Sequence, residues 1–90
     1  MTATILAMVK SRLNRIDNTL DNYLTGRITA AIQELESTGI YVKNNARDIM
    51  LVTDMVCWQY SNRDKASAMP EWLKLARRER FLQEERHSDT

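Results

Sequence analysis

Turn-forming residues are almost absent from this sequence, since its 90 residues include two glycines and one proline. A fold of many β-strands needs frequent tight turns, and glycine and proline are residues that such turns favour. Hydrophobic residues make up 43% of the chain, which is too large a share for a disordered polymer. A chain of this length can enclose one hydrophobic core. The sequence therefore predicts an all-α fold, a small bundle of four helices with short loops.

Apolar residues recur at helical spacing in four segments, which predict helices over residues 4–13, 19–38, 46–60 and 70–85. The strongest periodic pattern is a continuous seam on the second helix, formed by Leu20, Leu24, Ile28, Ala31 and Leu35. In the third segment apolar residues cover most of the helix circumference, which is typical of a helix enclosed on several sides. We therefore expect one domain over residues 1–86 with the third helix at its centre, followed by a flexible tail over residues 87–90.

Several residue types predict where these helices begin and end. Asn18 and Asn45 are expected N-caps for the second and third helices, because asparagine side chains accept hydrogen bonds from the first helical amides. Gly39 follows the second helix as a residue able to adopt a positive φ, and Ile40 after it predicts a Schellman stop. Pro70 suits the first turn of the fourth helix.

Residues able to perform catalysis are few. Cys57 lies in the most apolar helix, where burial raises the pKa of a thiol and lowers its reactivity, so we expect a packed core cysteine. Asp54 lies on the same helix and suits a structural pair or an interface. The single histidine, His87, is expected in the tail, and a metal site of Glu84, His87 and Asp89 would rest on spacings that are ordinary for a polar C-terminus. The sequence predicts no enzyme, no cofactor and no metal site, unless subunits share a site.

Charge and hydropathy exclude some partners. The formal net charge is only +1, from 13 basic and 12 acidic side chains, so no strong field attracts nucleic acid. A lone cysteine cannot form an internal disulfide, which favours an intracellular protein. No apolar stretch approaches the roughly 20 residues that cross a bilayer, so we expect no membrane partner.

The fourth helix is predicted to have two unlike faces. One is apolar and is expected to meet the core; it comprises Trp72, Leu75, Ala76 and Leu82, with Leu73 at its margin. On the opposite side Phe81 projects among three basic residues, Lys74, Arg77 and Arg78. An aromatic side chain flanked by basic ones suits contact with an acidic or aromatic partner surface. The alternative is that Phe81 folds onto the N-terminal arm of its own chain.

The second helix also has a distinct face opposite its seam. It is flat and is formed mainly by small side chains: Asn22, Gly26, Thr29, Ala30 and Gln33. A glycine inside a helix costs about 1 kcal/mol relative to alanine. Close approach of a helix from a second subunit would explain Gly26 and Ala30; a tolerated, neutral glycine is the alternative.

The order of these segments resembles the small head-tail connector proteins of tailed bacteriophages, from about residue 5 to residue 82. The most similar patterns are the start of the second helix at Leu20-Asp21, the pair Ala30-Ala31, the stop Thr38-Gly39-Ile40, the aromatic end WQYSNR at 58–63 and the closing RRERFL at 77–82.

This resemblance implies a structural virion protein, assembled in the host cytoplasm, that forms a homo-oligomeric ring at the head-tail junction. Its partners would be the portal protein on one side, the next head-completion or tail protein on the other, and DNA passing non-specifically through the channel. Connectors hold partner contacts in loops and terminal segments, which makes Arg63, Asp64 and Lys65 candidates together with the face around Phe81. The alternative function is a small helical nucleic-acid-binding regulator, because helices of these lengths can build a helix-turn-helix.

Overall fold

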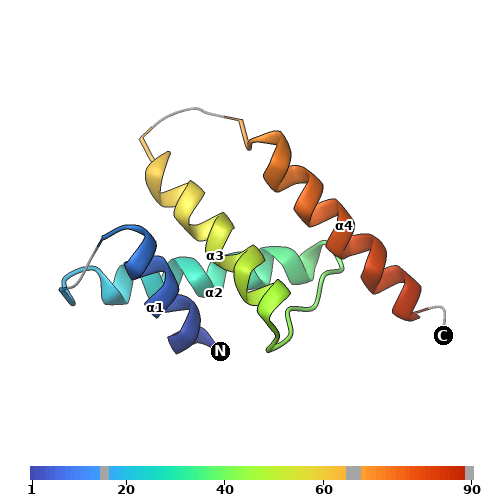
Figure 1. Ribbon diagram of the computed structural model, residues 1–90, viewed down its shortest axis with the longest axis horizontal. Helices are drawn as coiled ribbons and strands as arrows, with labels where there is room; N and C mark the ends of the chain where they lie inside the picture. Colours follow the sequence, from blue (N-terminus) through green and yellow to red (C-terminus); the bar gives the residue numbers. More distant parts are fainter. Residues whose placement is uncertain (15–16, 65–67, 89–90) are drawn as a thin grey trace.

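Four helices form the described part of the chain, in a computed structural model that describes residues 1–14, 17–64 and 68–88, with side chains in the last helix as far as residue 84. They are α1 (Thr2–Arg12), α2 (Asp21–Ser37), α3 (Ala46–Ser61) and α4 (Glu71–Ser88) (Figure 1). No strand occurs in these described ranges. The predicted all-α fold of four helices is confirmed, with every helix end within three residues of its expected position.

The helix α4 continues to Ser88, two residues past the predicted end of the domain at residue 86. The flexibility predicted for residues 87 and 88 stays a prediction. The rest of that prediction, residues 89 and 90, lies outside the described part of the chain.

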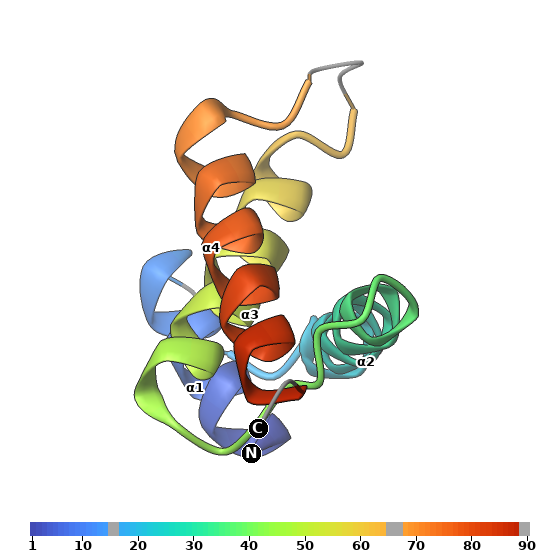
Figure 2. The ribbon, with the colours of Figure 1, turned by 90° about the vertical axis from the view of Figure 1, so that its right-hand side faces the viewer.

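The helix α3 lies at the centre of the molecule. In Figure 1 it runs between α1 and α4, and in Figure 2 α2 lies to one side of it. All the apolar side chains of α3 from Leu51 to Cys57 are buried. They meet Ile5 and Val9 of α1 and the seam of α2, whose members Leu24, Ile28, Ala31 and Leu35 are at most 1% exposed. These three helices therefore share one apolar core. Burial of each large aliphatic side chain in it contributes about 1.5–3 kcal/mol.

The end of α2 is the predicted Schellman stop. Gly39 has a φ of 98°, its amide donates to the Glu36 carbonyl at 3.0 Å, and the Ile40 amide donates to the Leu35 carbonyl at 2.9 Å. Ile40 is buried beside Leu35 in the core, which is the apolar contact that accompanies this motif. The chain then connects α2 to α3 without forming a strand in residues 40–43.

The two predicted asparagine caps have different outcomes. Asn45 is confirmed as the N-cap of α3, and its side-chain oxygen accepts a hydrogen bond from the Asp48 amide at 2.9 Å. Asn18 is not the cap of α2, because that position falls on Leu20, which makes no side-chain capping bond. The Asn18 side chain instead accepts a hydrogen bond from Lys10 Nζ at 3.0 Å, so its oxygen serves the contact between α1 and α2.

The helix α4 packs along α3, but the face that it presents is not the predicted one. Leu73, expected at the margin, is fully buried, while Trp72 and Leu75 are each 54% exposed and Leu82 is 41% exposed. Phe81, expected to project outward, is half-buried against the core. The reason is Arg80, which is only 3% exposed. Because this polar residue faces α3, its neighbours on the same side of α4 face α3 as well.

Candidate functional site

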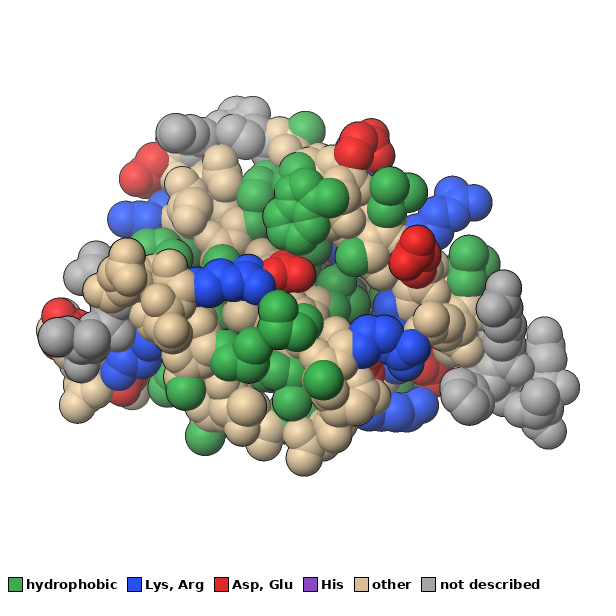
Figure 3. Space-filling model, in the orientation of Figure 1, with side chains coloured by type: hydrophobic (Ala, Val, Ile, Leu, Met, Phe, Trp, Pro, Cys, Tyr) green, Lys and Arg blue, Asp and Glu red, His purple; other side chains and the backbone are tan. Residues whose placement is uncertain are grey.

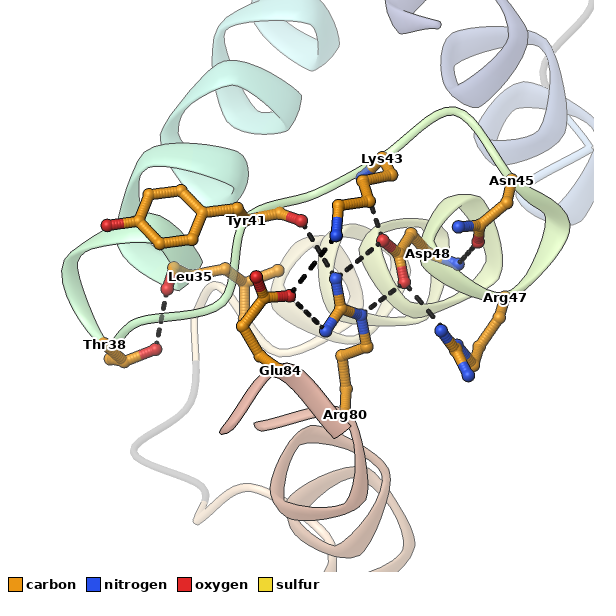
Figure 4. Close-up of polar contacts among 9 residues, drawn as sticks. All are labelled: Leu35, Thr38, Tyr41, Lys43, Asn45, Arg47, Asp48, Arg80 and Glu84. Carbon is orange, nitrogen blue, oxygen red and sulfur yellow. Dashed lines mark hydrogen bonds and ion pairs between the residues drawn. The ribbon is translucent and has the colours of Figure 1, made fainter. Parts of the chain in front are cut away.

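The inner side of α4 is attached through a buried polar group, here called the Asp48 cluster, which comprises Asp48, Arg80, Glu84, the Tyr41 carbonyl and the Lys43 amide (Figure 4). Arg80 donates from Nε to Asp48 Oδ1 at 2.7 Å and from Nη2 to Asp48 Oδ2 at 3.1 Å. Its guanidinium also donates to the Tyr41 carbonyl at 2.9 Å and to Glu84 Oε2 at 2.8 Å. A planar guanidinium suits this bidentate contact with a carboxylate.

Asp48 is fixed by its own helix as well as by Arg80. Its carboxylate accepts a hydrogen bond from the Lys43 amide at 2.8 Å, while its amide donates to Asn45. Burial raises the pKa of Asp48, but the hydrogen bonds from Arg80 and Lys43 and the nearby charges of Arg80 and Arg47 outweigh burial and hold that pKa below its ordinary value. Asp48 is therefore ionised at neutral pH. The carboxylate oxygens of Asp48 already accept hydrogen bonds from donors of this chain. The cluster therefore serves to anchor α4 to α3.

The local sequence patterns did not indicate this cluster, and neither Asp48 nor Arg80 was among the predicted functional residues. The available signal was the register of α4, in which Leu73, Ala76 and Arg80 are spaced i, i+3 and i+7 on one face. A charged residue in such a series indicates a buried partner, and Asp48 is that partner.

A pocket of about 300 Å³ lies where the end of α2 meets α4. We call it the α4 pocket; it is lined by Thr38, Ile40, Arg77, Arg78 and Phe81. Phe81 reaches the α2 stop so closely that a Cβ atom on Gly39 would lie 3.2 Å from Phe81 Cε2. The structure thus brings three of the predicted contact residues, Arg77, Arg78 and Phe81, together. The Phe81 ring therefore contacts its own chain at the α2 stop, and not at the N-terminal arm that was the alternative to an interface.

The basic residues of α4 differ in how they are paired. Arg77 is half-buried, and its guanidinium lies 3.7 Å from Glu34 of α2 and 3.8 Å from the Met69 sulfur. Arg78 and Lys74 are exposed and make no hydrogen bond or ion pair with other residues in the described part of the chain. Arg78 is therefore the pocket residue whose charge is available to a partner.

The outer side of α4 carries exposed apolar side chains, here called the α4 stripe: Trp72, Leu75 and Leu82. In Figure 3 apolar side chains lie on the surface over α4 among acidic and basic ones. Exposed Leu or Trp residues that stand alone are common, whereas several that follow one helix indicate a contact surface.

The face of α2 opposite its seam is exposed, as predicted. We call it the small-residue face: Asn22, Gly26, Thr29, Ala30 and Gln33. A Cβ atom added at Gly26 would have no atom of the described chain within 4 Å. Packing inside the subunit therefore gives no reason for a glycine here.

The candidates that follow α3 are exposed where they are described. Arg63 stacks over the Tyr60 ring, with 4.1 Å from the guanidinium carbon to the ring centroid, and donates to the Tyr60 carbonyl at 2.6 Å. Asp64 is exposed, and Lys65 lies outside the described residues.

Cys57 and Asp54, the two residues of α3 that could take part in chemistry, are engaged in packing and in an ion pair. Cys57 is buried, and burial raises the pKa of its thiol, although the nearby Arg12 guanidinium opposes this. Asp54 pairs with Arg12 of α1 at 2.5 Å, which fits its reading as a structural pair.

The side chains of His87 and Asp89 lie outside the described part, so the predicted grouping of these two residues with Glu84 is not described. Across the residues that are described, no three His, Cys, Asp or Glu side chains are grouped to hold a metal ion, and no helix has the length and apolar character to span a bilayer.

Comparisons of the chain with protein-family models, with curated proteins and with solved structures gave no match.

Proposed function

We propose that this chain is the subunit of a head-tail connector of a tailed bacteriophage, a ring that adds below the portal, joins head to tail and lets DNA pass. The observation that carries the proposal is a pair of exposed surfaces with unlike shapes on two helices of one chain. The α4 stripe offers bulky apolar side chains, and the small-residue face of α2 offers a flat surface with open space at Gly26.

Surfaces of this kind favour a ring over a symmetric pair. When one face of a subunit binds a different face of the next copy, the contact is heterologous, and repetition closes a ring if the rotation allows. In the ring that we propose, the α4 stripe of one subunit packs on the small-residue face of its neighbour. Glycine and alanine at such a contact let two helices approach closely.

The remaining exposed residues suit the axial partners. The loop after α3 presents Arg63 and Asp64, and the α4 pocket presents Arg78. We assign these to contacts with the portal and with the next head-completion or tail protein. A net charge of +1 agrees with a channel through which DNA passes, since a strongly basic lumen would retain phosphates.

The experiment is a measurement of mass by native mass spectrometry and sedimentation, at several concentrations, alone and with a purified portal ring. We expect assembly that increases with concentration or with added portal. Gly26→Leu should fold at least as well as the natural chain, because nothing lies within 4 Å of the added Cβ atom and leucine favours a helix, but it should assemble poorly. The matched control is Ala7→Leu, which places the same side chain on an exposed position of α1.

Two outcomes would contradict the proposal. One is a chain that stays monomeric at all concentrations and does not join the portal. The other is tight, sequence-selective binding to duplex DNA in a retardation assay at moderate salt, which would instead support the small helical regulator.

A further inference from the structure

We propose that the α4 pocket binds a short acidic segment of a partner protein, with one apolar side chain of that segment in the pocket and a neighbouring carboxylate on Arg78. This inference rests on the part of the proposed function that assigns Arg78 to a partner protein, and it deepens that part by naming the ligand; it concerns the single subunit and needs no ring closure.

The dimensions of the pocket suit one bulky side chain. Its volume of about 300 Å³ lies at the lower end of the roughly 300–1,000 Å³ typical of small-molecule sites. The apolar surface open to a ligand includes the half-buried Phe81 ring, whereas Ile40 behind it is 2% exposed and belongs to the core. A leucine or phenylalanine side chain would therefore replace water on apolar surface there.

The charged residues at the pocket indicate which group of the ligand binds next to its apolar side chain. Arg77 already has Glu34 and the Met69 sulfur as neighbours, whereas Arg78 is exposed and makes no hydrogen bond or ion pair with any other described residue. A guanidinium presents several N–H groups in a fixed plane and binds a carboxylate through two of them. One carboxylate next to the apolar side chain would complete the contacts that Arg78 lacks.

Nearby acidic residues favour a single carboxylate over a polyanion. Glu34 lies against Arg77 at the pocket, and Glu79, next to Arg78 in sequence, is exposed. A run of phosphates following α4 would meet these carboxylates and lose the energy gained at Arg78. A peptide can instead place one acidic group at Arg78 and none at Glu34.

The pocket is held in shape before any ligand arrives. Arg80, between Arg78 and the Glu84 end of the helix, is fixed by two hydrogen bonds to Asp48, and the Phe81 ring rests on the Gly39 turn. A preformed site loses less conformational entropy on binding, which favours measurable affinity for a short peptide.

The test is a titration of the full-length, ¹⁵N-labelled chain with synthetic peptides, capped at both ends, that carry a central phenylalanine between two glutamates. We expect shift changes at the amides of residues 38–40 and 77–81, and saturable binding. Replacing the phenylalanine by alanine should abolish saturation, and replacing the glutamates by glutamine should weaken binding about as much as the loss of Arg78 does. Arg78→Gln should weaken binding about three- to tenfold, as expected for an accessible charged hydrogen bond.

The matched control is Lys74→Gln, which removes one exposed positive charge from the same helix outside the pocket, and should change affinity less than about twofold. If both variants weakened peptide binding equally, the effect would come from the overall positive charge of α4, and the proposal would be overturned. The absence of binding would also overturn it. Equal binding of a single-stranded oligonucleotide with the same dependence on Arg78 would make the ligand a nucleic acid. Because the titration uses single chains, its failure would leave ring assembly untouched, and loss of the ring with intact peptide binding would contradict the connector alone.

Discussion

The two sides of α3 are packed by different chemistry. Toward α1 and α2, the fully buried part of the contact is apolar and includes Ile5, Val9 and Leu24, while the polar pairs Arg12–Asp54 and Arg27–Gln59 are partly exposed. Toward α4, the described part of that helix contributes one fully buried apolar side chain, Leu73, together with the half-buried Ala76 and Phe81, and the buried ion pair of Arg80 with Asp48 completes the contact. An apolar core tolerates small shifts, whereas a bidentate ion pair with fixed hydrogen bonds specifies one position for the helix.

This difference explains where sequence patterns predicted the packed face correctly. Hydrophobic spacing gave the right inner face for α2, since the residues buried there are the apolar ones. It gave the wrong face for α4, because the apolar Trp72 and Leu75 are exposed while the charged Arg80 is buried. Each prediction below tests whether the two sides of α3 are as different as the contacts indicate.

The largest effect is expected from Arg80→Met. This change leaves the Asp48 carboxylate buried without its main partner, and breaking such a pair costs about 3–5 kcal/mol. The free energy of unfolding, measured by urea titration with circular dichroism, should fall by that amount. Arg78→Met, which alters an exposed arginine two residues earlier, should change it by less than about 0.5 kcal/mol. A loss below about 1 kcal/mol in Arg80→Met would mean that water reaches Asp48 and that the ion pair is not the anchor.

Next come two leucine truncations that compare the sides directly. Leu24→Ala should cost about 3 kcal/mol and Leu73→Ala about 2 kcal/mol, because both side chains are fully buried but the surroundings of Leu73 can close more of the cavity. Urea unfolding of the two variants side by side gives the comparison. If Leu73→Ala costs as much as Leu24→Ala or more, α4 belongs to the same apolar core and the distinction fails.

A smaller effect should appear with pH. The folded-state pKa of Asp48 is held below its ordinary value, so Asp48 stabilises the fold above its unfolded pKa of about 3.9, and this contribution is lost as pH falls through the lower folded value. The free energy of unfolding should therefore decrease below about pH 4. In Arg80→Met the same carboxyl group is buried without its partner, so protonation should relieve it and the acid loss should be smaller. Parallel pH profiles for the two proteins would show that Asp48 does not sense Arg80.

The smallest effect on stability is expected on the outer side of α4. Leu75→Gln changes a residue that is 54% exposed, so the free energy of unfolding should change by less than about 0.5 kcal/mol. Under the proposed ring contact, the same variant should lower the assembled fraction in sedimentation, while Lys74→Gln should not. A stability loss of several kcal/mol would place Leu75 in the core.

The sequence was sufficient for the helices, the α2 seam, the Asn45 cap and the glycine stop, because each depends on residues close together in the chain. It was insufficient for the Asp48 cluster and the α4 pocket. Asp48 and Arg80 are 32 residues apart, and the Tyr41 carbonyl is 39 residues from Arg80, so no local pattern joins them. The pocket depends on the same long-range contact. Arg77, Arg78 and Phe81 were identified as candidates from their place on one predicted face of the fourth helix, and only the packed structure shows that they line one cavity with the end of α2.

The attachment of α4 has a consequence for motion. A helix whose described part buries one leucine fully and otherwise makes half-buried or ionic contacts has a lower free energy of local opening than the apolar core that it covers. Amide protons in the middle of α4 should therefore exchange with deuterated water earlier than those of α3, and binding in the α4 pocket should slow them. The α4 helix thus has one position in the folded subunit, but it leaves that position by local unfolding more readily than α3 leaves the core.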